Sequence, residues 1–172
     1  MTIKVGINGM GRIGRMIVRS IYENYKGKII IKHINNRSNS EICANLLKYD
    51  SIHGNFSSLV KSGGNYIKIN KEKISYTQHS MINDIKWKKY GVDYVFECTG
   101  KFNSKDQLLP HIVNGVKKVI VSAPCKMADK TVVYGVNHKK ITKNDRIISA
   151  ASCTTNCLAP VADVINKNFI IL

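Results

Sequence analysis

The chain has 172 residues, enough for one full hydrophobic core, and it carries a formal net charge of +16. No apolar run approaches the roughly 20 residues that a membrane span needs, and the N-terminus leads into a strand-like pattern without a charged and apolar leader. The number of cysteines, five, is odd, and their spacing does not match a disulfide framework. Neither the cysteines nor the histidines are spaced as metal ligands. We therefore expect a cytoplasmic protein with reduced thiols, no membrane association and no metal site.

The excess of positive charge is mostly lysine, spread along the chain in runs no longer than pairs. The sequence is also rich in Ile and Asn, and an AT-rich genome imposes this combination on any protein. We favour that explanation over a selected nucleic-acid surface, which stays the weaker alternative. The charge should still raise the affinity for anions such as phosphorylated metabolites.

The first part of the chain predicts a strand, a helix and a second strand. Residues 3–8 have the apolar character of a buried strand, and the glycine-rich sequence GMGRIG follows at 9–14. Apolar residues then recur at helical spacing as far as a helix end near 25–27. Residues 29–34 predict the second buried strand, which completes a βαβ unit.

The rest of the chain continues to alternate between strands and helices. The predicted helices are one through 42–47, capped by Ser38 or Asn39, one at 107–113, and one that begins at Ser152. The predicted strands are 56–60, 66–69, 74–76, 92–97, 118–122, 132–134 and 146–148. This order predicts an α/β fold: a Rossmann-type doubly wound parallel sheet with a small antiparallel insertion around the turn at 62–65.

The glycine-rich sequence has the spacing of a dinucleotide-binding turn, in the strand-to-helix context that makes this spacing informative. Gly9 permits a tight turn, Gly11 allows a pyrophosphate to approach the backbone, and Gly14 allows close packing of helix on strand. The free N–H groups at the helix start bind phosphate, with Arg12 as a cation beside them. We expect an NAD or NADP site here.

The end of the second strand departs from this fingerprint, because Asn36 and Arg37 stand where an acidic residue is expected. A carboxylate would accept hydrogen bonds from the ribose and repel a 2′-phosphate; Asn36 lacks that repulsion, and Arg37 can pair with a phosphate. Two interpretations stay open. Either the protein accepts NADP, or Asn36 binds the ribose of NAD and Arg37 is a solvated surface residue.

The sequence ASCTTNCLAP at 151–160 predicts the start of a helix with a thiol in its first turn. The positive end of a helix stabilises a thiolate, so Cys153 is a candidate nucleophile. Its spacing alone also fits a buried structural cysteine. Cys157 lies one turn further along, away from the end of the helix dipole, and we interpret it as a packing thiol.

Six motifs occur along the chain in this order: KVGINGMGRIGR, LLKYDSIHG, ECTG, KKVIVSAP, VYGVNH and SAASCTTNCLAP. Together they closely resemble the amino-terminal half of the glyceraldehyde-3-phosphate dehydrogenase family. The resemblance runs over the whole chain. It implies an NAD(P)-binding Rossmann domain at 1–150 and the start of the catalytic domain, with its active-site cysteine helix, at 151–172, the remainder being absent.

The resemblance also implies roles for individual residues. Cys153 is the family's nucleophile, and Ser152 and Thr154 flank the substrate. The family's ribose-binding aspartate falls on Asn36. The cofactor residues expected from the motifs and the resemblance together are Gly9, Gly11, Arg12, Ile13, Gly14, Asn36, Arg37, Thr99, Gly100, Phe102 and Ser122.

The activity implied by the resemblance is the phosphorylating oxidation of glyceraldehyde 3-phosphate in glycolysis or gluconeogenesis. The aldehyde is oxidised through a thioester on Cys153, with hydride transfer to NAD or NADP and cleavage by inorganic phosphate. The full-length family member is usually a homotetramer. The family's general-base histidine comes later than Leu172, so we expect the isolated chain to be inactive. The alternatives are a nucleotide-binding module without redox turnover, or a relative such as erythrose-4-phosphate dehydrogenase.

Overall fold

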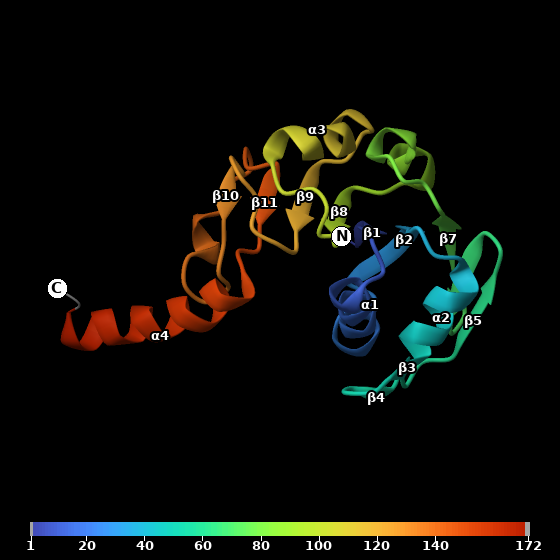
Figure 1. The fold of residues 1–172 in the computed structure, drawn as a ribbon, viewed down its shortest axis with the longest axis horizontal. Helices are drawn as coiled ribbons and strands as arrows, with labels where there is room; N and C mark the ends of the chain where they lie inside the picture. The colour runs from blue at the N-terminus through green and yellow to red at the C-terminus, as the bar shows by residue number, and fades with distance from the viewer. Residues whose placement is uncertain (1, 171–172) are drawn as a thin grey trace.

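The structure is a computed structural model that describes residues 2–170. Within that range nine strands form one sheet, in the order β10-β11-β9-β8-β1-β2-β7-β6-β5 (Figure 1). The strands are β1 (Ile3–Asn8), β2 (Ile29–Asn35), β5 (Val60–Gly63), β6 (Tyr66–Ile69), β7 (Glu72–Thr77), β8 (Tyr94–Glu97), β9 (Lys118–Val121), β10 (Lys130–Thr131) and β11 (Ile147–Ser149). A separate antiparallel pair is formed by β3 (Tyr49–Asp50) and β4 (Gly54–Asn55).

Four α-helices and three short 3-10 helices are described in residues 2–170. They are α1 (Arg12–Asn24), α2 (Ser40–Lys48), α3 (Lys105–Val113), α4 (Cys153–Phe169), η1 (Ile82–Asp84), η2 (Trp87–Tyr90) and η3 (His138–Lys140). Helices α1 and α2 lie on one side of the sheet in Figure 1, and α3 lies on the other. No helix in this range is both long and apolar enough to cross a bilayer.

The sheet runs parallel outward from β1 in both directions, which confirms the Rossmann-type doubly wound fold. Strand β1 pairs in parallel with β2 on one side and with β8 on the other. The antiparallel insertion is β5, β6 and β7, and β7 joins it to the main sheet by parallel pairing with β2. Since the strand order reverses at β1, the carboxyl ends of β1, β2 and β8 define a ligand-binding edge.

Two apolar cores, one on each side of β1, hold these elements together. The first joins β1, α1, β2, α2, β6 and β7 through residues such as Ile7, Val18 and Leu47. The second joins η2, β8, α3, β9 and β11 through Trp87, Leu108 and similar residues. Helix α4 contributes a buried side chain to neither core, and it extends away from the sheet in Figure 1.

Most predicted elements are confirmed, and two predicted strands are wrong. The strand predicted at 56–60 begins only at Val60, because the Phe56 N–H donates to the Lys48 carbonyl at 2.9 Å. The Phe56 ring is buried beneath the Arg19 guanidinium, whose carbon lies 5.3 Å from the ring centre. No strand forms at 132–134, because β10 ends at Thr131. The chain then turns, and the Val133 N–H donates to Asn137 Oδ1 at 2.8 Å. In both segments a backbone N–H donates to an asparagine side chain, Leu59 to Asn70 and Val133 to Asn137, whereas the Val132 N–H still donates to the Ser149 carbonyl of β11.

The cap of α2 resolves a choice that the sequence left open. Asn39 Oδ1 accepts a hydrogen bond from the Ile42 N–H at 2.8 Å, so Asn39 is the cap. The backbone carbonyl of Ser38 instead accepts a hydrogen bond from the Tyr76 hydroxyl. At the other end of the chain, Ser152 caps α4 as predicted, since its Oγ accepts from the Thr155 N–H at 3.0 Å.

His33 on β2 is buried in a neutral, fully paired setting. Its Nδ1 lies 2.7 Å from Ser75 Oγ and its Nε2 lies 2.9 Å from Thr77 Oγ1. Its ring stacks on Tyr90, with the ring centres 3.8 Å apart. Burial, with a smaller contribution from the charge of His79, lowers the pKa of His33 to about 3.

We predict that the protein loses stability as the pH falls below about 6.5, the ordinary pKa of a histidine in an unfolded chain. Between that pH and the lowered pKa of His33, the unfolded chain binds a proton that the folded chain does not, so acid favours unfolding. At pH 5 the loss from this residue is about 2 kcal/mol relative to pH 7. Urea unfolding of the wild type and of His33→Gln at both pH values measures it. Equal pH dependence in the two proteins would contradict the prediction.

Candidate functional site

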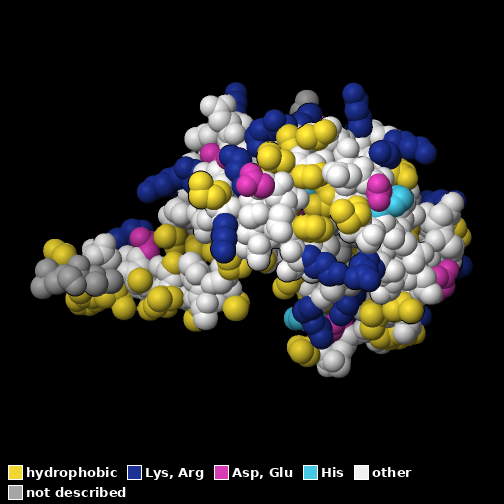
Figure 2. Space-filling view, turned by 45° about the horizontal axis from the view of Figure 1, so that its top comes forward, with side chains coloured by type: hydrophobic (Ala, Val, Ile, Leu, Met, Phe, Trp, Pro, Cys, Tyr) yellow, Lys and Arg dark blue, Asp and Glu magenta, His cyan; other side chains and the backbone are white. Residues whose placement is uncertain are grey.

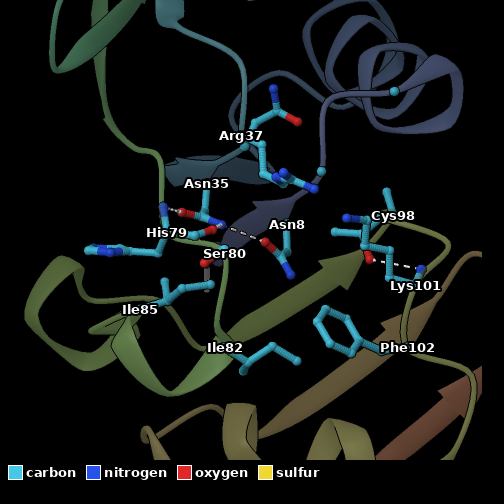
Figure 3. A pocket seen from close by; sticks show the side chains of 14 residues that line it. Asn8, Asn35, Arg37, His79, Ser80, Ile82, Ile85, Cys98, Lys101 and Phe102 are labelled. Atoms are coloured by element: carbon cyan, nitrogen blue, oxygen red, sulfur yellow. Dashed lines mark hydrogen bonds between the residues drawn. The ribbon is translucent and has the colours of Figure 1, made fainter.

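A cleft lies at the carboxyl ends of β1, β2 and β8, where the strand order reverses (Figure 3). Its cavity volume is about 210 Å³. It is lined by Asn8, Gly9, Gly11, Asn35, Asn36, Arg37, His79, Ser80, Ile82, Ile85, Cys98, Thr99, Lys101 and Phe102. One wall carries polar groups from the strand ends and the other carries Ile82, Ile85 and Phe102, so the cleft suits a ligand with polar and flat apolar parts.

The glycine turn between β1 and α1 forms one border of the cleft. Gly9 has φ +94°, and a Cβ there would lie 2.7 Å from the Thr99 nitrogen. A Cβ on Gly14 would lie 2.0 Å from the Gly9 carbonyl oxygen. The chain's own packing therefore requires glycine at both positions.

Gly11 differs from the other two glycines, because a Cβ there would meet nothing within 4 Å. Its φ of −69° is open to any residue, so nothing within the chain requires glycine at this position. Helix α1 starts directly after Gly11 with no side-chain cap and no acidic residue in its first turn. Open space beside free helix N–H groups fits the pyrophosphate of a dinucleotide.

Six of the predicted cofactor residues line this cleft, and five do not. Those in the lining are Gly9, Gly11, Asn36, Arg37, Thr99 and Phe102; those outside it are Arg12, Ile13, Gly14, Gly100 and Ser122. Gly14 acts through packing, as described above. Arg12 points toward β3 and forms an ion pair with Asp50, rather than standing free beside the glycine turn.

Asn36 is fixed by both ends of its carboxamide. Its Oδ1 accepts from the Met10 N–H of the glycine turn at 3.0 Å, and its Nδ2 donates to Cys43 Sγ at 3.1 Å. The Tyr76 hydroxyl lies 3.0 Å from the same sulfur, and burial raises the pKa of the Cys43 thiol, which keeps it protonated. Asn36 thus ties the glycine turn to β2, and it brings no negative charge to the cleft.

Arg37 follows Asn36 directly in the sequence and carries a positive charge. Its side chain points into the cleft in Figure 3, above Asn8 in this view. On the opposite side Lys101 and Phe102 follow the Thr99 loop. The thiol of Cys98, which also lines the cleft, is protonated, because burial raises its pKa to about 12.

The polar floor of the cleft was not predicted from the sequence. Asn35 and Asn8 lie in register on β2 and β1, and Asn8 lies in register with Glu97 on β8. Asn35 Nδ2 donates to Asn8 Oδ1 at 2.8 Å, and Asn8 Nδ2 donates to Glu97 Oε2 at 2.6 Å. A signal was present, since each of these residues is a polar residue at the end of a strand that is mostly apolar.

Cys153 lies in the first turn of α4, as its sequence predicts, and it is exposed, which decides against the alternative of a buried structural cysteine within the described residues. The Ser152 Oγ that caps the helix also lies 3.0 Å from Thr154 Oγ1, so the predicted substrate residues flank the cysteine as a hydroxyl cluster. Ser152 lines a second cavity of about 480 Å³, between α4 and the loops after β8 and β9. In the described range no histidine forms a hydrogen bond with Cys153, so this part of the chain provides no base for it.

The interpretation of Cys157 as a packing thiol is wrong for the described residues, where Cys157 is exposed. It belongs to a side of α4 whose apolar side chains Leu158, Val161 and Val164 are also exposed. Figure 2 shows hydrophobic side chains gathered along this helix. The thiol is exposed because no described element covers that side of α4.

Comparison with known proteins identifies the family of the chain. The family model for the glyceraldehyde 3-phosphate dehydrogenase, NAD binding domain, matches residues 3–105. The chain is 46% identical to glyceraldehyde-3-phosphate dehydrogenase of Cereibacter sphaeroides over 166 residues, which are 96% of this chain and 49% of that protein. It is 45% identical to the Mycoplasma pneumoniae enzyme of the same name over 172 residues, 99% of this chain and 50% of that protein.

The extent of these matches is as informative as their identity. Glyceraldehyde-3-phosphate dehydrogenase of Pseudomonas aeruginosa is 42% identical over 168 residues, which cover 97% of this chain and 50% of that protein. The chain thus spans about half the length of the curated relatives it matches. It belongs to the glyceraldehyde-3-phosphate dehydrogenase family and corresponds to the amino-terminal half with its NAD-binding domain.

Proposed function

We propose that this chain provides the dinucleotide-binding and nucleophile-bearing half of a phosphorylating glyceraldehyde-3-phosphate dehydrogenase. Its substrates would be glyceraldehyde 3-phosphate and inorganic phosphate, with NAD or NADP as cofactor. The observation that carries the proposal is the open position at Gly11, beside the uncapped start of α1 and facing the cleft. The membership of the family supports the reaction type.

The chemistry proposed for this chain centres on the thiol of Cys153. Its thiolate adds to the aldehyde carbon, and the backbone N–H groups at the start of α4 stabilise the oxyanion that forms. The bound dinucleotide supplies the capacity to accept a hydride. The acyl group then stays on the sulfur as a thioester until inorganic phosphate displaces it. Ser152 and Thr154 would contact the substrate beside the sulfur.

We divide the chain, within this proposal, into a nucleotide-binding domain at 1–150 and the start of a catalytic domain at 151–172. The division is supported by α4, which buries no side chain against the sheet. The exposed apolar residues on α4 would pack against further catalytic-domain structure in a full-length, cytoplasmic homotetramer. Erythrose 4-phosphate stays an alternative substrate.

A second candidate function is a nucleotide-binding module without redox turnover. It is favoured by the absence of any histidine hydrogen-bonded to Cys153 in residues 2–170. The two candidates share the dinucleotide cleft and differ in whether Cys153 reacts.

Gly11→Ala is predicted to abolish NAD binding by this chain while changing its free energy of unfolding by less than about 1 kcal/mol. A methyl group there meets open space in the protein but occupies the path of the pyrophosphate. Gly14→Ala is the matched control: its methyl group would lie 2.0 Å from a carbonyl oxygen, so it should lower the free energy of unfolding by about 2 kcal/mol or more. Calorimetric titration and urea unfolding measure both. Unchanged NAD affinity in Gly11→Ala would contradict the proposed site.

The choice between NAD and NADP is predicted to depend on the corner formed by Asn36 and Arg37. Asn36→Asp should weaken NADP about tenfold more than NAD, because a carboxylate repels the 2′-phosphate. Arg37→Ala should also weaken NADP selectively, because a phosphate partner is lost. Lys101→Ala is the control, since Lys101 lines the other side of the cleft and should affect both dinucleotides alike. A clear preference for NAD that Arg37→Ala leaves unchanged would refute acceptance of NADP.

The 172-residue chain alone is predicted to give no reduction of NAD or NADP with glyceraldehyde 3-phosphate and phosphate, because no base accompanies Cys153. Absorbance at the reduced-nicotinamide band measures this. If turnover persists through purification, is lost in Cys153→Ser and is kept in Cys157→Ser, the thiol chemistry is right and the predicted incompetence of this chain is wrong.

A further inference from the structure

Glu97, the last residue of β8, is a buried carboxylate with only 1% of its surface exposed. Its Oε2 accepts from Asn8 Nδ2 at 2.6 Å and lies 3.0 Å from His111 Nε2. Its Oε1 accepts from the Thr99 backbone N–H at 2.8 Å and also from the Thr99 hydroxyl. Four polar groups therefore surround the two oxygens.

The protons in this cluster can be counted, because each neighbour has a second partner. The Trp87 indole N–H donates to His111 Nδ1 at 2.9 Å, so Nδ1 carries no proton and His111 is a neutral ring that donates from Nε2. The Thr99 hydroxyl accepts from the Lys101 N–H at 3.2 Å, which leaves its own proton for Glu97. All four neighbours of Glu97 are donors, and four donors saturate an ionised carboxylate.

The resulting negative charge has no cation beside it. His111 is neutral, and in residues 2–170 no lysine or arginine side chain forms a hydrogen bond or ion pair with Glu97. Three of its four donors belong to two residues that line the cleft, one to Asn8 and two to Thr99. The carboxylate thus lies one residue beneath the cleft surface, in a buried setting where a charge is only weakly screened.

We propose that Glu97 biases the cleft toward the oxidised form of the nicotinamide cofactor. This inference rests on the proposed function, namely that the cleft binds NAD or NADP. The oxidised ring carries one positive charge, and the addition of hydride removes it. Both forms carry the same pyrophosphate and riboses, so a fixed negative charge beneath the cleft distinguishes them only through the ring.

The test compares NAD⁺ and NADH as ligands of the 172-residue chain. NADH binding is followed by its fluorescence, and NAD⁺ by displacement of NADH. In Glu97→Gln, the ratio of the NADH to the NAD⁺ dissociation constant should fall about threefold or more, because the charge is removed. His111→Gln is the matched control. It disturbs the same cluster and keeps the carboxylate charge, so the ratio should stay at the wild-type value even if both affinities fall.

Trp87→Phe provides a test that does not alter Glu97. It removes the indole N–H and frees His111 Nδ1 to take a proton, which would neutralise Glu97. The polar groups that face His111 are Glu97 from β8 and Trp87 from η2; behind the indole lies His33 on β2, which stays neutral because burial lowers its pKa. In Trp87→Phe the ratio should therefore fall below the wild-type value, toward that of Glu97→Gln.

The outcomes distinguish failure of the proposed dinucleotide binding from failure of the role proposed for Glu97. If the wild type binds neither NAD⁺ nor NADH, the proposed function itself is wrong, and this inference with it. If both forms bind and the ratio is equal in the wild type, Glu97→Gln and His111→Gln, Glu97 has only a structural role. If Glu97→Gln does not fold, a wild-type ratio in Trp87→Phe overturns the inference by itself.

Discussion

The close contact between the Gly9 carbonyl and Gly14 is the constraint on which the cleft depends. A side chain on Gly14 would lie 2.0 Å from that oxygen, so α1 can approach β1 this closely only with glycine there. The approach aims the first N–H groups of α1 at the cleft and leaves Gly11 against open space. Asn36 then fixes the turn from the side of β2, through the Met10 N–H. The geometry of the glycine turn therefore follows from backbone packing and one amide, and Arg12, which pairs with Asp50, is not needed to build it.

The floor of the cleft is held by polar groups that are buried yet fully paired. Burial of a neutral amide whose hydrogen bonds are lost costs roughly 1–3 kcal/mol, and burial of an unpaired carboxylate costs more. Here Asn35, Asn8 and Glu97 satisfy one another across three adjacent strands, and the outer partners Thr99 and His111 complete the row. Because Asn35, Asn8 and Glu97 each form at least two hydrogen bonds, the orientation of each side chain is fixed and the row is rigid. A rigid floor fixes the spacing between the glycine turn and the Thr99 loop, the two borders of the cleft.

The sequence was sufficient to predict the elements that rest on periodicity, namely the βαβ unit, the glycine turn and the capped start of α4. It was insufficient where a distant side chain decides the local structure. Phe56 lies outside the predicted strand, with its N–H on the Lys48 carbonyl and Arg19 over its ring, and the pattern of residues 56–60 contains no trace of either contact. The polar floor was missed for a related reason. An asparagine at the end of a strand reads as a solvated loop residue, and only the register of β1, β2 and β8 joins Asn35, Asn8 and Glu97 into one row.

The cleft and the thiol are positioned by different means. The cleft is fixed by contacts among strands of one sheet, whereas α4 depends on the elbow that leads into it from β11. Ala151 has φ +61°, a left-handed conformation that costs a non-glycine residue about 1 kcal/mol or more. It is held by its own N–H to Ser149 Oγ and by Asn156 Nδ2, which donates to the Ala150 carbonyl at 2.7 Å. The elbow sets the direction in which α4 leaves the sheet, but no described residue packs on its apolar side. Within residues 2–170 the cleft thus has its supporting contacts, while the setting of Cys153 depends on what contacts α4.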